Sequence, residues 1–190
     1  MTLYDLIIKR RTIRRFQQKP VPEELLMNCV NAARLAPTAR NLQPLEFIII
    51  DEPGTVAQVF ETAHWGGFAT MGKIEKGKRA MAYILIILNK QIRDSGYDQD
   101  VGIAAENIVL TALDADVGCC MMRAVGWEKL KEILTIPETH EPVLLVAMGY
   151  PDESPVAEDS EEEMQYYQDA VGVIHVPKRK MKDVVHRNKF

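Results

Sequence analysis

Three apolar segments, each the length of one buried strand, constrain the fold of this chain more than any other feature. They occupy residues 45–50, 82–88 and 143–148. A long alanine-rich stretch at residues 98–116 lies between the second and the third and has the composition of a largely buried helix. Because helical segments and strands interleave without a regular βαβ repeat, we expect an α+β fold in which a sheet is covered by helices.

A basic cluster follows the first expected helix. Thr2 and Asp5 have the spacing of a capping box, so a short helix should begin there and end near Lys9 or Arg10. Five of the seven positions from 9 to 15 are basic, although the formal net charge of the chain is -4. An acidic protein that gathers arginine in one short segment is expected to build a local anion site.

The chemistry of the cluster favours phosphate as the anion. An arginine guanidinium can bond two oxygens at once, and Thr12 adds a hydroxyl donor within the cluster. Two alternatives remain open. Cations at a helix C-terminus match the helix dipole without any ligand, and a nucleic-acid patch would also be basic. The acidic remainder of the chain and the lack of a binding-motif pattern count against nucleic acid, which we do not expect as a partner.

The other elements follow from start and stop signals. Residues 20–24 begin a helix, and it must stop near Ala36 because Pro37 disfavours helical backbone before it. We further expect helices at 56–63 and 127–134, a short strand at 119–122, Gly118 as the C-cap of the long helix, and loop with a short helix in the glycine-rich residues 64–77.

The last forty or so residues differ from the rest. The run at 158–163 is acidic and the run at 177–182 is basic, with few apolar residues between them. We therefore divide the chain into a core, residues 1–151, and an extension, residues 152–190, that runs over a surface, in our interpretation that of a second subunit. A chain that stops before Pro177 is expected to be unstable or monomeric.

The bulk composition is that of an ordinary globular domain. The 190 residues are 47% hydrophobic and 26% charged, which suits one domain with a sizeable core. No apolar run approaches the roughly 20 residues of a membrane span, and no secretory signal is visible. Three cysteines, two of them adjacent, favour a reducing compartment, and we expect a cytoplasmic protein. No Cys/His spacing predicts a metal.

Three further places carry polar or reactive groups. Asn41 and Gln43 lie in a loop at residues 36–44 that could contact a mixed-polarity ring, or could simply hydrogen-bond to itself. Asn107 lies in the apolar helix and is expected to tie neighbouring backbone. Adjacent Cys119 and Cys120 are poorly placed to bridge, so we expect a core or pocket-lining role for them.

Taken together, these segments resemble the nitroreductase family of flavin-dependent oxidoreductases, over nearly the whole chain and in order. Residues 10–16, Arg-Arg-Thr-Ile-Arg-Arg-Phe, look like the family's Arg-Arg-Ser-x-Arg-x-Phe signature. Residues 36–44 look like its Ala-Pro-Ser-x-x-Asn-x-Gln-Pro-Trp loop, and residues 100–107 resemble its Asp-x-x-x-Ala-x-x-Asn helix. Residues 118–121, 149–151 and 186–188 fall where short members of the family carry similar residues.

The resemblance implies a mainly antiparallel central sheet and an intertwined homodimer with a C-terminal arm, which binds FMN at its interface. By position, Arg10 and Thr12 would hold the FMN phosphate together with Arg187, and Arg14 would support the reduced flavin near its pyrimidine end. The full set of implied cofactor-binding residues is Arg10, Arg11, Thr12, Arg14, Pro37, Thr38, Ala39, Asn41, Cys120, Met121 and Arg187. Of these, Thr38, Ala39 and Asn41 would reach the flavin from the other subunit.

The implied activity is a two-step exchange. NADH or NADPH would reduce FMN, and a small organic acceptor such as a nitroaromatic or a quinone would then reoxidise it, without a protein nucleophile. Two departures from the family pattern concern the substrate: Leu45 replaces the expected Trp, and Arg40 places a cation where small residues are common. A dehalogenating or flavin-fragmenting relative, and a flavin-binding module without turnover, remain as alternatives.

Overall fold

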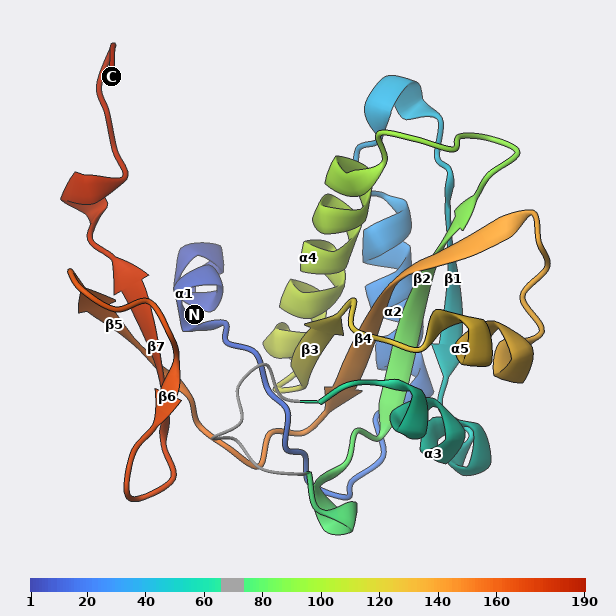
Figure 1. Ribbon diagram of the computed structural model, residues 1–190, viewed down its shortest axis with the longest axis horizontal. Coiled ribbons are helices and arrows are strands. Elements are labelled where there is room, and N and C mark those ends of the chain that lie inside the picture. Colours follow the sequence, from blue (N-terminus) through green and yellow to red (C-terminus); the bar gives the residue numbers. More distant parts are fainter. Residues whose placement is uncertain (66–73) are drawn as a thin grey trace.

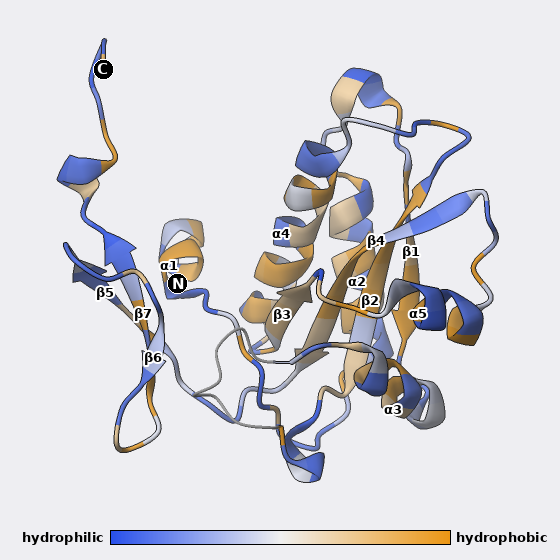
Figure 2. Cartoon of the chain, viewed as in Figure 1, coloured by the Kyte–Doolittle hydropathy of each residue, from blue (hydrophilic) through white to orange (hydrophobic). Residues whose placement is uncertain are grey.

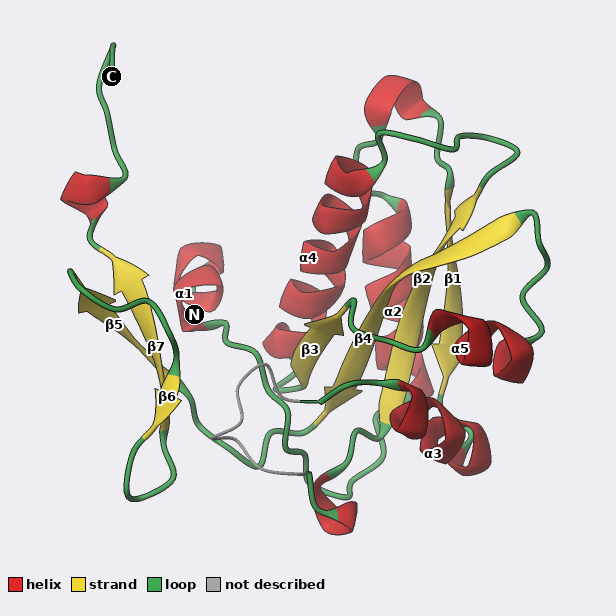
Figure 3. Ribbon diagram, in the orientation of Figure 1, coloured by secondary structure: helices red, strands yellow, loops and turns green. Residues whose placement is uncertain are grey.

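The computed structural model describes residues 1–65 and 74–190. Its centre is a four-stranded sheet with the strand order β1-β2-β4-β3, in which every neighbouring pair is antiparallel (Figure 3). The expected α+β fold with an antiparallel central sheet is confirmed. The four strands are β1 (Leu45–Ile50), β2 (Ala82–Asn89), β3 (Gly118–Met122) and β4 (His140–Gly149).

Helices cover both faces of this sheet (Figure 1). Side chains of β2 alternate between two cores: Ile84 and Ile86 pack with α2 and α4, whereas Tyr83 and Leu85 pack in the core that α3 and α5 cover. Because β2 is buried on both faces, its sequence is nearly all apolar from Ala82 to Leu88, and most of the strand is orange in Figure 2. The helices are α1 (Leu3–Lys9), α2 (Glu23–Arg34), α3 (Pro53–Thr62), α4 (Asp98–Asp114) and α5 (Trp127–Leu134).

One predicted helix end is wrong. Gly118 is not the C-cap of α4: that helix ends at Asp114 with Ala115 as its cap, and Asp116 takes the left-handed conformation with φ 59°. Gly118 is instead the first residue of β3. A Cβ atom there would lie 2.6 Å from Cγ1 of Ile13, so the position requires glycine for close approach rather than for a turn.

The segment after α1 runs along the ends of β3 and β4. Ile13 N–H donates to the Cys119 carbonyl at 2.9 Å, and Gln17 N–H donates to the Tyr150 carbonyl at 2.8 Å. The side chain of Phe16, which is fully buried, lies where a Cβ atom on Gly149 would be. Two glycines thus allow the basic segment to lie directly against the sheet.

The extension contains strands that the sequence analysis does not predict. Beyond the core, β5 (Val156–Ser160) pairs in parallel with β7 (Ile174–Arg179), and β6 (Tyr167–Gln168) pairs with β7 in antiparallel fashion. The chain then continues through a short 3-10 turn, Met181–Asp183, to a C-terminus that points away from the core (Figure 1). We call residues 156–179 the tail sheet.

Two observations bear on the remaining predictions. Most of the glycine-rich stretch, residues 66–73, lies outside the described residues; the described remainder includes a 3-10 turn at Lys76–Lys78. Within the described ranges, none of the helices combines the length and apolar character that a membrane crossing requires.

Candidate functional site

The basic segment borders a cavity that the tail sheet closes. Arg10, Arg11, Thr12 and Arg14 line this tail-side cavity, of about 140 Å³, from the core. The tail sheet supplies the opposite wall with Tyr166, Ile174, Val176 and Lys178. Two of the three family-derived phosphate candidates, Arg10 and Thr12, therefore share one cavity with Lys178, a cation that the sequence analysis does not single out.

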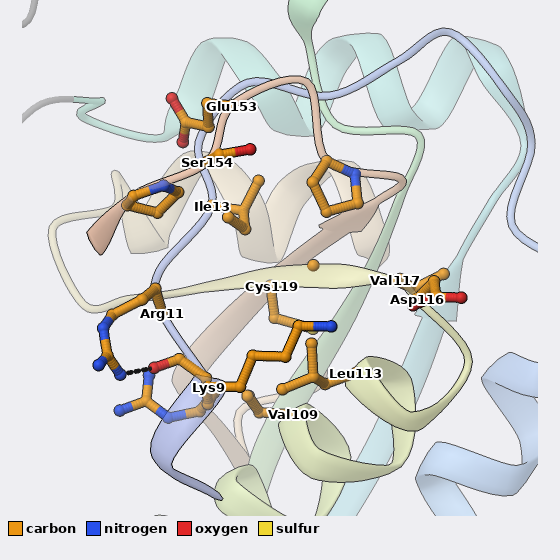
Figure 4. A pocket seen from close by; sticks show the side chains of 14 residues that line it. Lys9, Arg11, Ile13, Val109, Leu113, Asp116, Val117, Cys119, Glu153 and Ser154 are labelled. Carbon is orange, nitrogen blue, oxygen red and sulfur yellow. Dashed lines mark hydrogen bonds between the residues drawn. The ribbon is translucent and has the colours of Figure 1, made fainter. Parts of the chain in front are cut away.

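A second cavity lies on the α4 side of the same segment (Figure 4). It has a volume of about 230 Å³ and is lined by Lys9, Arg10 and Arg11 together with apolar side chains of α4. In Figure 4, Arg11 and Glu153 lie on one side and Asp116 and Val117 on the other. Since Arg10 and Arg11 line both cavities, we treat the two as parts of one anion-binding region.

The two arginines at the start of the segment differ in their partners. The Arg10 Nε atom lies 3.3 Å from the Glu106 carboxylate of α4. Arg11 donates from Nη1 to the Arg10 carbonyl, while its Nε is buried and has no hydrogen-bond partner in the described structure. Burial, followed by the charge of Arg10, lowers the pKa of Arg11. A buried guanidinium donor without an acceptor is the feature that an oxyanion ligand would satisfy.

Arg14 connects the tail-side cavity to a third one, which we call the ring-side cavity. This cavity, of about 150 Å³, is lined by Arg14, by Cys120 and Met121 of β3, and by His64 and Trp65. β3 lies at the edge of the sheet, and the basic segment takes up part of its outer edge, since Ile13 N–H donates to the Cys119 carbonyl. The structure thus places Arg14, Cys120 and Met121 together, as the family resemblance implies.

The two adjacent cysteines are free and buried. Burial raises the pKa of the Cys120 thiol to about 11, and burial also raises the pKa of Cys119. Both side chains therefore stay protonated at neutral pH and lack the thiolate that a nucleophilic or redox cysteine needs. Their observed positions agree with the expected core and pocket-lining role.

Glu153 anchors the basic segment from the far end of the chain. Its carboxylate accepts a hydrogen bond from Arg14 N–H at 2.5 Å and one from Arg15 N–H at 3.3 Å. The same carboxylate pairs with Arg15 Nη1 at 3.3 Å. This contact spans 139 positions in sequence, and no local pattern predicts it.

The loop that contains Pro37, Thr38, Ala39 and Asn41 lies elsewhere on the same chain. Ala39 N–H donates to the Asp100 carboxylate at 3.2 Å, which ties the loop to the N-terminal end of α4. The anion-binding region lies beside the middle and the C-terminal half of that helix, from Glu106 to Leu113, roughly 10–20 Å further along its axis. One chain therefore does not bring the loop to the basic segment.

The same loop has an unusual backbone. Arg40, Asn41 and Gln43 all have positive φ values, of 56°, 56° and 51°. The loop also hydrogen-bonds to itself, since Gln43 N–H donates to the Thr38 hydroxyl at 3.1 Å. Strained, self-supported backbone of this kind gathers at ligand-binding sites.

Asn107 behaves as predicted: its amide donates to the Ala32 carbonyl at 2.9 Å.

Arg187 is not brought to the other phosphate candidates. It is exposed in the terminal segment that follows the Met181–Asp183 turn. In the described structure the tail contributes Lys178 to the cavity instead. Lys178 belongs to the basic run at 177–182, which the sequence analysis identifies, but the sequence analysis does not predict the strand β7 that carries it.

A cavity lined by three arginines and a threonine hydroxyl, on an α+β scaffold, is the kind of site that a phosphorylated cofactor would occupy. The chain belongs to the nitroreductase family: the family model matches residues 7–150.

Individual relatives agree with this assignment. The chain is 27% identical over 165 residues to a Methanothermobacter thermautotrophicus protein named "Putative NADH dehydrogenase/NAD(P)H nitroreductase", covering 84% of this chain and 82% of that protein. It is 23% identical over 182 residues to an iodotyrosine deiodinase of Haliscomenobacter hydrossis, with 82% of each chain covered. A Desulfovibrio desulfuricans protein solved in complex with FMN has the same fold, with a TM-score of 0.74, 20% identity, and coverage of 100% and 98%.

Proposed function

We propose that this protein is an FMN-dependent oxidoreductase that passes electrons from NAD(P)H to a small organic acceptor. FMN is the cofactor of the nitroreductase family, and relatives named as NAD(P)H oxidoreductases support the enzyme class. The single observation that carries the proposal is the cavity shared by Arg10, Arg11, Thr12 and Arg14, with the unpartnered Nε of Arg11 beside it.

The residues that line the tail-side cavity match the chemistry of FMN. Arg10, Arg11 and Thr12 would hold the phosphate, since guanidinium and hydroxyl donors match its oxygens. Lys178 of the tail would add a fourth donor. Arg14 would place its cation near the pyrimidine end of the ring, where negative charge develops on reduction. When bound, FMN supplies hydride exchange between the nicotinamide and the acceptor.

Apolar side chains form part of the wall of the ring-side cavity. Met121 is 39% exposed on the outer face of β3, and Trp65 stacks on Phe60 with ring centroids 5.2 Å apart. These apolar groups flank Arg14 and His64 in the same cavity. The arrangement suits a flat acceptor, with cationic side chains nearby for a polar substituent.

We further propose that the working form is a homodimer. The loop at residues 37–41 and the basic segment are both candidate cofactor contacts, yet one chain holds them roughly 10–20 Å apart along α4. A second copy could bring its loop to the first chain's segment. A second subunit could also bury the exposed apolar residues of α1, which are Leu3, Tyr4, Ile7 and Ile8. A chain that stops before Pro177 should be monomeric by light scattering, and a dimer would contradict the proposed arm.

The first experiment is the visible spectrum of the purified protein before and after NADH or NADPH is added without oxygen. A flavin spectrum that bleaches supports the proposed reductase, and acceptors can then be compared. A flavin spectrum that persists would leave a binding module or a different electron donor. A colourless protein that FMN fails to reconstitute would contradict the proposal.

Two substitutions test the assigned roles. Arg10→Ala should weaken FMN binding by about 10- to 100-fold, because a charge-assisted hydrogen bond to phosphate is lost. Arg14→Ala should retain FMN but reduce acceptors more slowly. Arg10→Ala protein that purifies fully flavinated with normal kinetics would show that the phosphate site is elsewhere.

A dehalogenase is the second candidate. Two bacterial proteins named iodotyrosine deiodinase match about four fifths of the chain, at 23% and 22% identity. Arg14 and Arg123 in the ring-side cavity would suit the carboxylate of a halogenated amino acid. The reduced enzyme should be mixed separately with iodotyrosine and with a nitroaromatic: iodide release without nitro reduction would favour this alternative.

A further inference from the structure

Among the described residues, two carboxylates contact the basic segment, one at each end, and they do so in different ways. At the phosphate end, Glu106 lies 3.3 Å from the Arg10 guanidinium; the Glu106 side chain is 40% exposed and that of Arg10 is 29% exposed. At the ring end, Glu153 is 7% exposed and takes two backbone N–H groups as well as a guanidinium. Glu106 therefore competes with a bound anion for the Arg10 side chain, whereas Glu153 accepts hydrogen bonds from the backbone of the segment.

The contacts of Glu153 fix the direction of Arg14 without touching its guanidinium. In an extended segment, successive side chains point to opposite sides, so pinning the backbone N–H groups of residues 14 and 15 sets where each side chain projects. Arg15 projects toward Glu153, while Arg14 projects into the tail-side and ring-side cavities. The same stretch is held a second time, because Asp152 N–H donates to the Arg15 carbonyl at 2.9 Å.

The charge of Glu153 is balanced by Arg15 rather than by Arg14. The Arg15 Nη1 atom lies 3.3 Å from the Glu153 carboxylate. Arg14 instead lies over the Tyr166 ring, 5.2 Å from its centroid. Among the described residues, no carboxylate forms an ion pair with the Arg14 guanidinium itself. At Cys120 in the ring-side cavity, burial raises the pKa, the Arg14 charge lowers it and the Glu153 charge raises it, so the two charges oppose each other there.

We propose that Glu153 is a positioning residue: it holds the backbone of Arg14 and Arg15 so that the Arg14 cation is aimed at the ring of the bound flavin. This inference rests on the proposed function. The expected consequence is that the Glu153 carboxylate, through the placement of Arg14, raises the preference of the site for reduced over oxidised FMN.

The test compares midpoint potentials of bound FMN in wild type, Arg14→Ala, Glu153→Ala, Glu153→Gln and the double variant Arg14→Ala/Glu153→Ala. Fluorescence titration of the apoproteins with FMN is measured alongside. We expect Glu153→Ala to lower the preference for reduced FMN by about tenfold, which is about 30 mV for a two-electron couple. Arg14→Ala should shift the potential in the same direction, and the double variant should equal Arg14→Ala alone, since both changes remove one effect.

Glu153→Gln separates position from charge. Its amide oxygen can still accept backbone hydrogen bonds, so the potential should return most of the way to the wild-type value. Glu153→Gln also provides a measurable potential if the Glu153→Ala protein fails to fold. A raised potential in Glu153→Gln would mean that the carboxylate acts by its charge, and an unchanged potential in Glu153→Ala would mean that it is only structural. Either result overturns the proposal.

Glu106→Gln is the matched control at the other end of the segment. It removes a carboxylate from Arg10, so it should change FMN affinity and leave the potential within error of wild type. A shift equal to that of Glu153→Ala would contradict a role specific to the ring end. Wild-type protein that binds no FMN would defeat the proposed function itself. An Arg14→Ala potential that matches wild type would leave the FMN proposal intact and overturn the roles of Arg14 and Glu153 at the flavin ring.

Discussion

The central sheet and the tail sheet of this protein are stabilised by different forces. In the central sheet, Leu85 and Leu145 are fully buried in the core that α3 and α5 cover. In the tail sheet, His175 lies between two carboxylates, with Nδ1 2.9 Å from Glu158 and Nε2 3.3 Å from Asp169, and Tyr167 stacks on it. Apolar burial depends little on pH or salt, whereas exposed ion pairs depend on both. The tail sheet, which forms one wall of the candidate cofactor cavity, is thus the part of the molecule whose stability depends on pH and salt.

The largest expected effect comes from a cavity in the central sheet. Leu145→Ala should lower the free energy of unfolding by about 2–5 kcal/mol, because it removes a fully buried side chain from β4. Val156→Ala is the matched change in the tail sheet, where the side chain is 42% exposed, and should cost less than about 0.5 kcal/mol. Urea unfolding of both variants measures the contrast. Equal losses would show that the two sheets unfold as one unit with equal packing.

The next effect concerns the place where the basic segment meets the sheet. Gly118→Ala should destabilise the protein by about 1–3 kcal/mol, because the new Cβ would lie 2.6 Å from Ile13 Cγ1. Thermal melting measures the loss. Gly102→Ala on α4 is the control: nothing lies within 4 Å of the added Cβ, so a helix-favouring substitution should be neutral or stabilising. A neutral Gly118→Ala would mean that the segment can move away from β3.

The central sheet with its helices and the tail sheet also differ in how well the sequence predicts their structure. Leu45–Ile50 and Trp127–Leu134 have the structure that their patterns predict, because each is decided by its own apolar spacing. The tail strands were missed because their pairing depends on polar partners rather than on an apolar face. The contact of Glu153 with Arg14 was missed for a related reason: it joins positions 139 apart, and neither residue has a local signal for the other.

The tail sheet should loosen as pH rises. Hydrogen bonds to Glu158 and then Asp169 raise the pKa of His175 above its ordinary value, so the imidazolium contributes stability that is fully present below pH of about 6.5 and is lost as pH rises through the raised pKa. Hydrogen bonds from His175 and Tyr167 lower the pKa of Glu158, whose contribution is lost only at acid pH. Both ring nitrogens face carboxylates, and a neutral ring can donate to only one.

Hydrogen exchange of residues 156–179, corrected for the intrinsic effect of pH, measures this opening. Protection should fall with rising pH in wild type, and His175→Gln should remove the dependence while the central sheet stays protected in both. Tail protection that is independent of pH in wild type would show that His175 does not hold the sheet.

The smallest expected effect tests whether the central sheet uses polar contacts at all. Tyr83 is fully buried on β2, and its hydroxyl has no hydrogen-bond partner among the described residues. Burial raises the pKa of that hydroxyl far above its ordinary value, so the group stays neutral. Tyr83→Phe removes a polar atom that is desolvated without compensation, so it should leave the free energy of unfolding unchanged or raise it by about 1 kcal/mol. A loss of stability in urea unfolding would mean that this hydroxyl has a partner in solution, and that the core of the central sheet is not held by apolar burial alone.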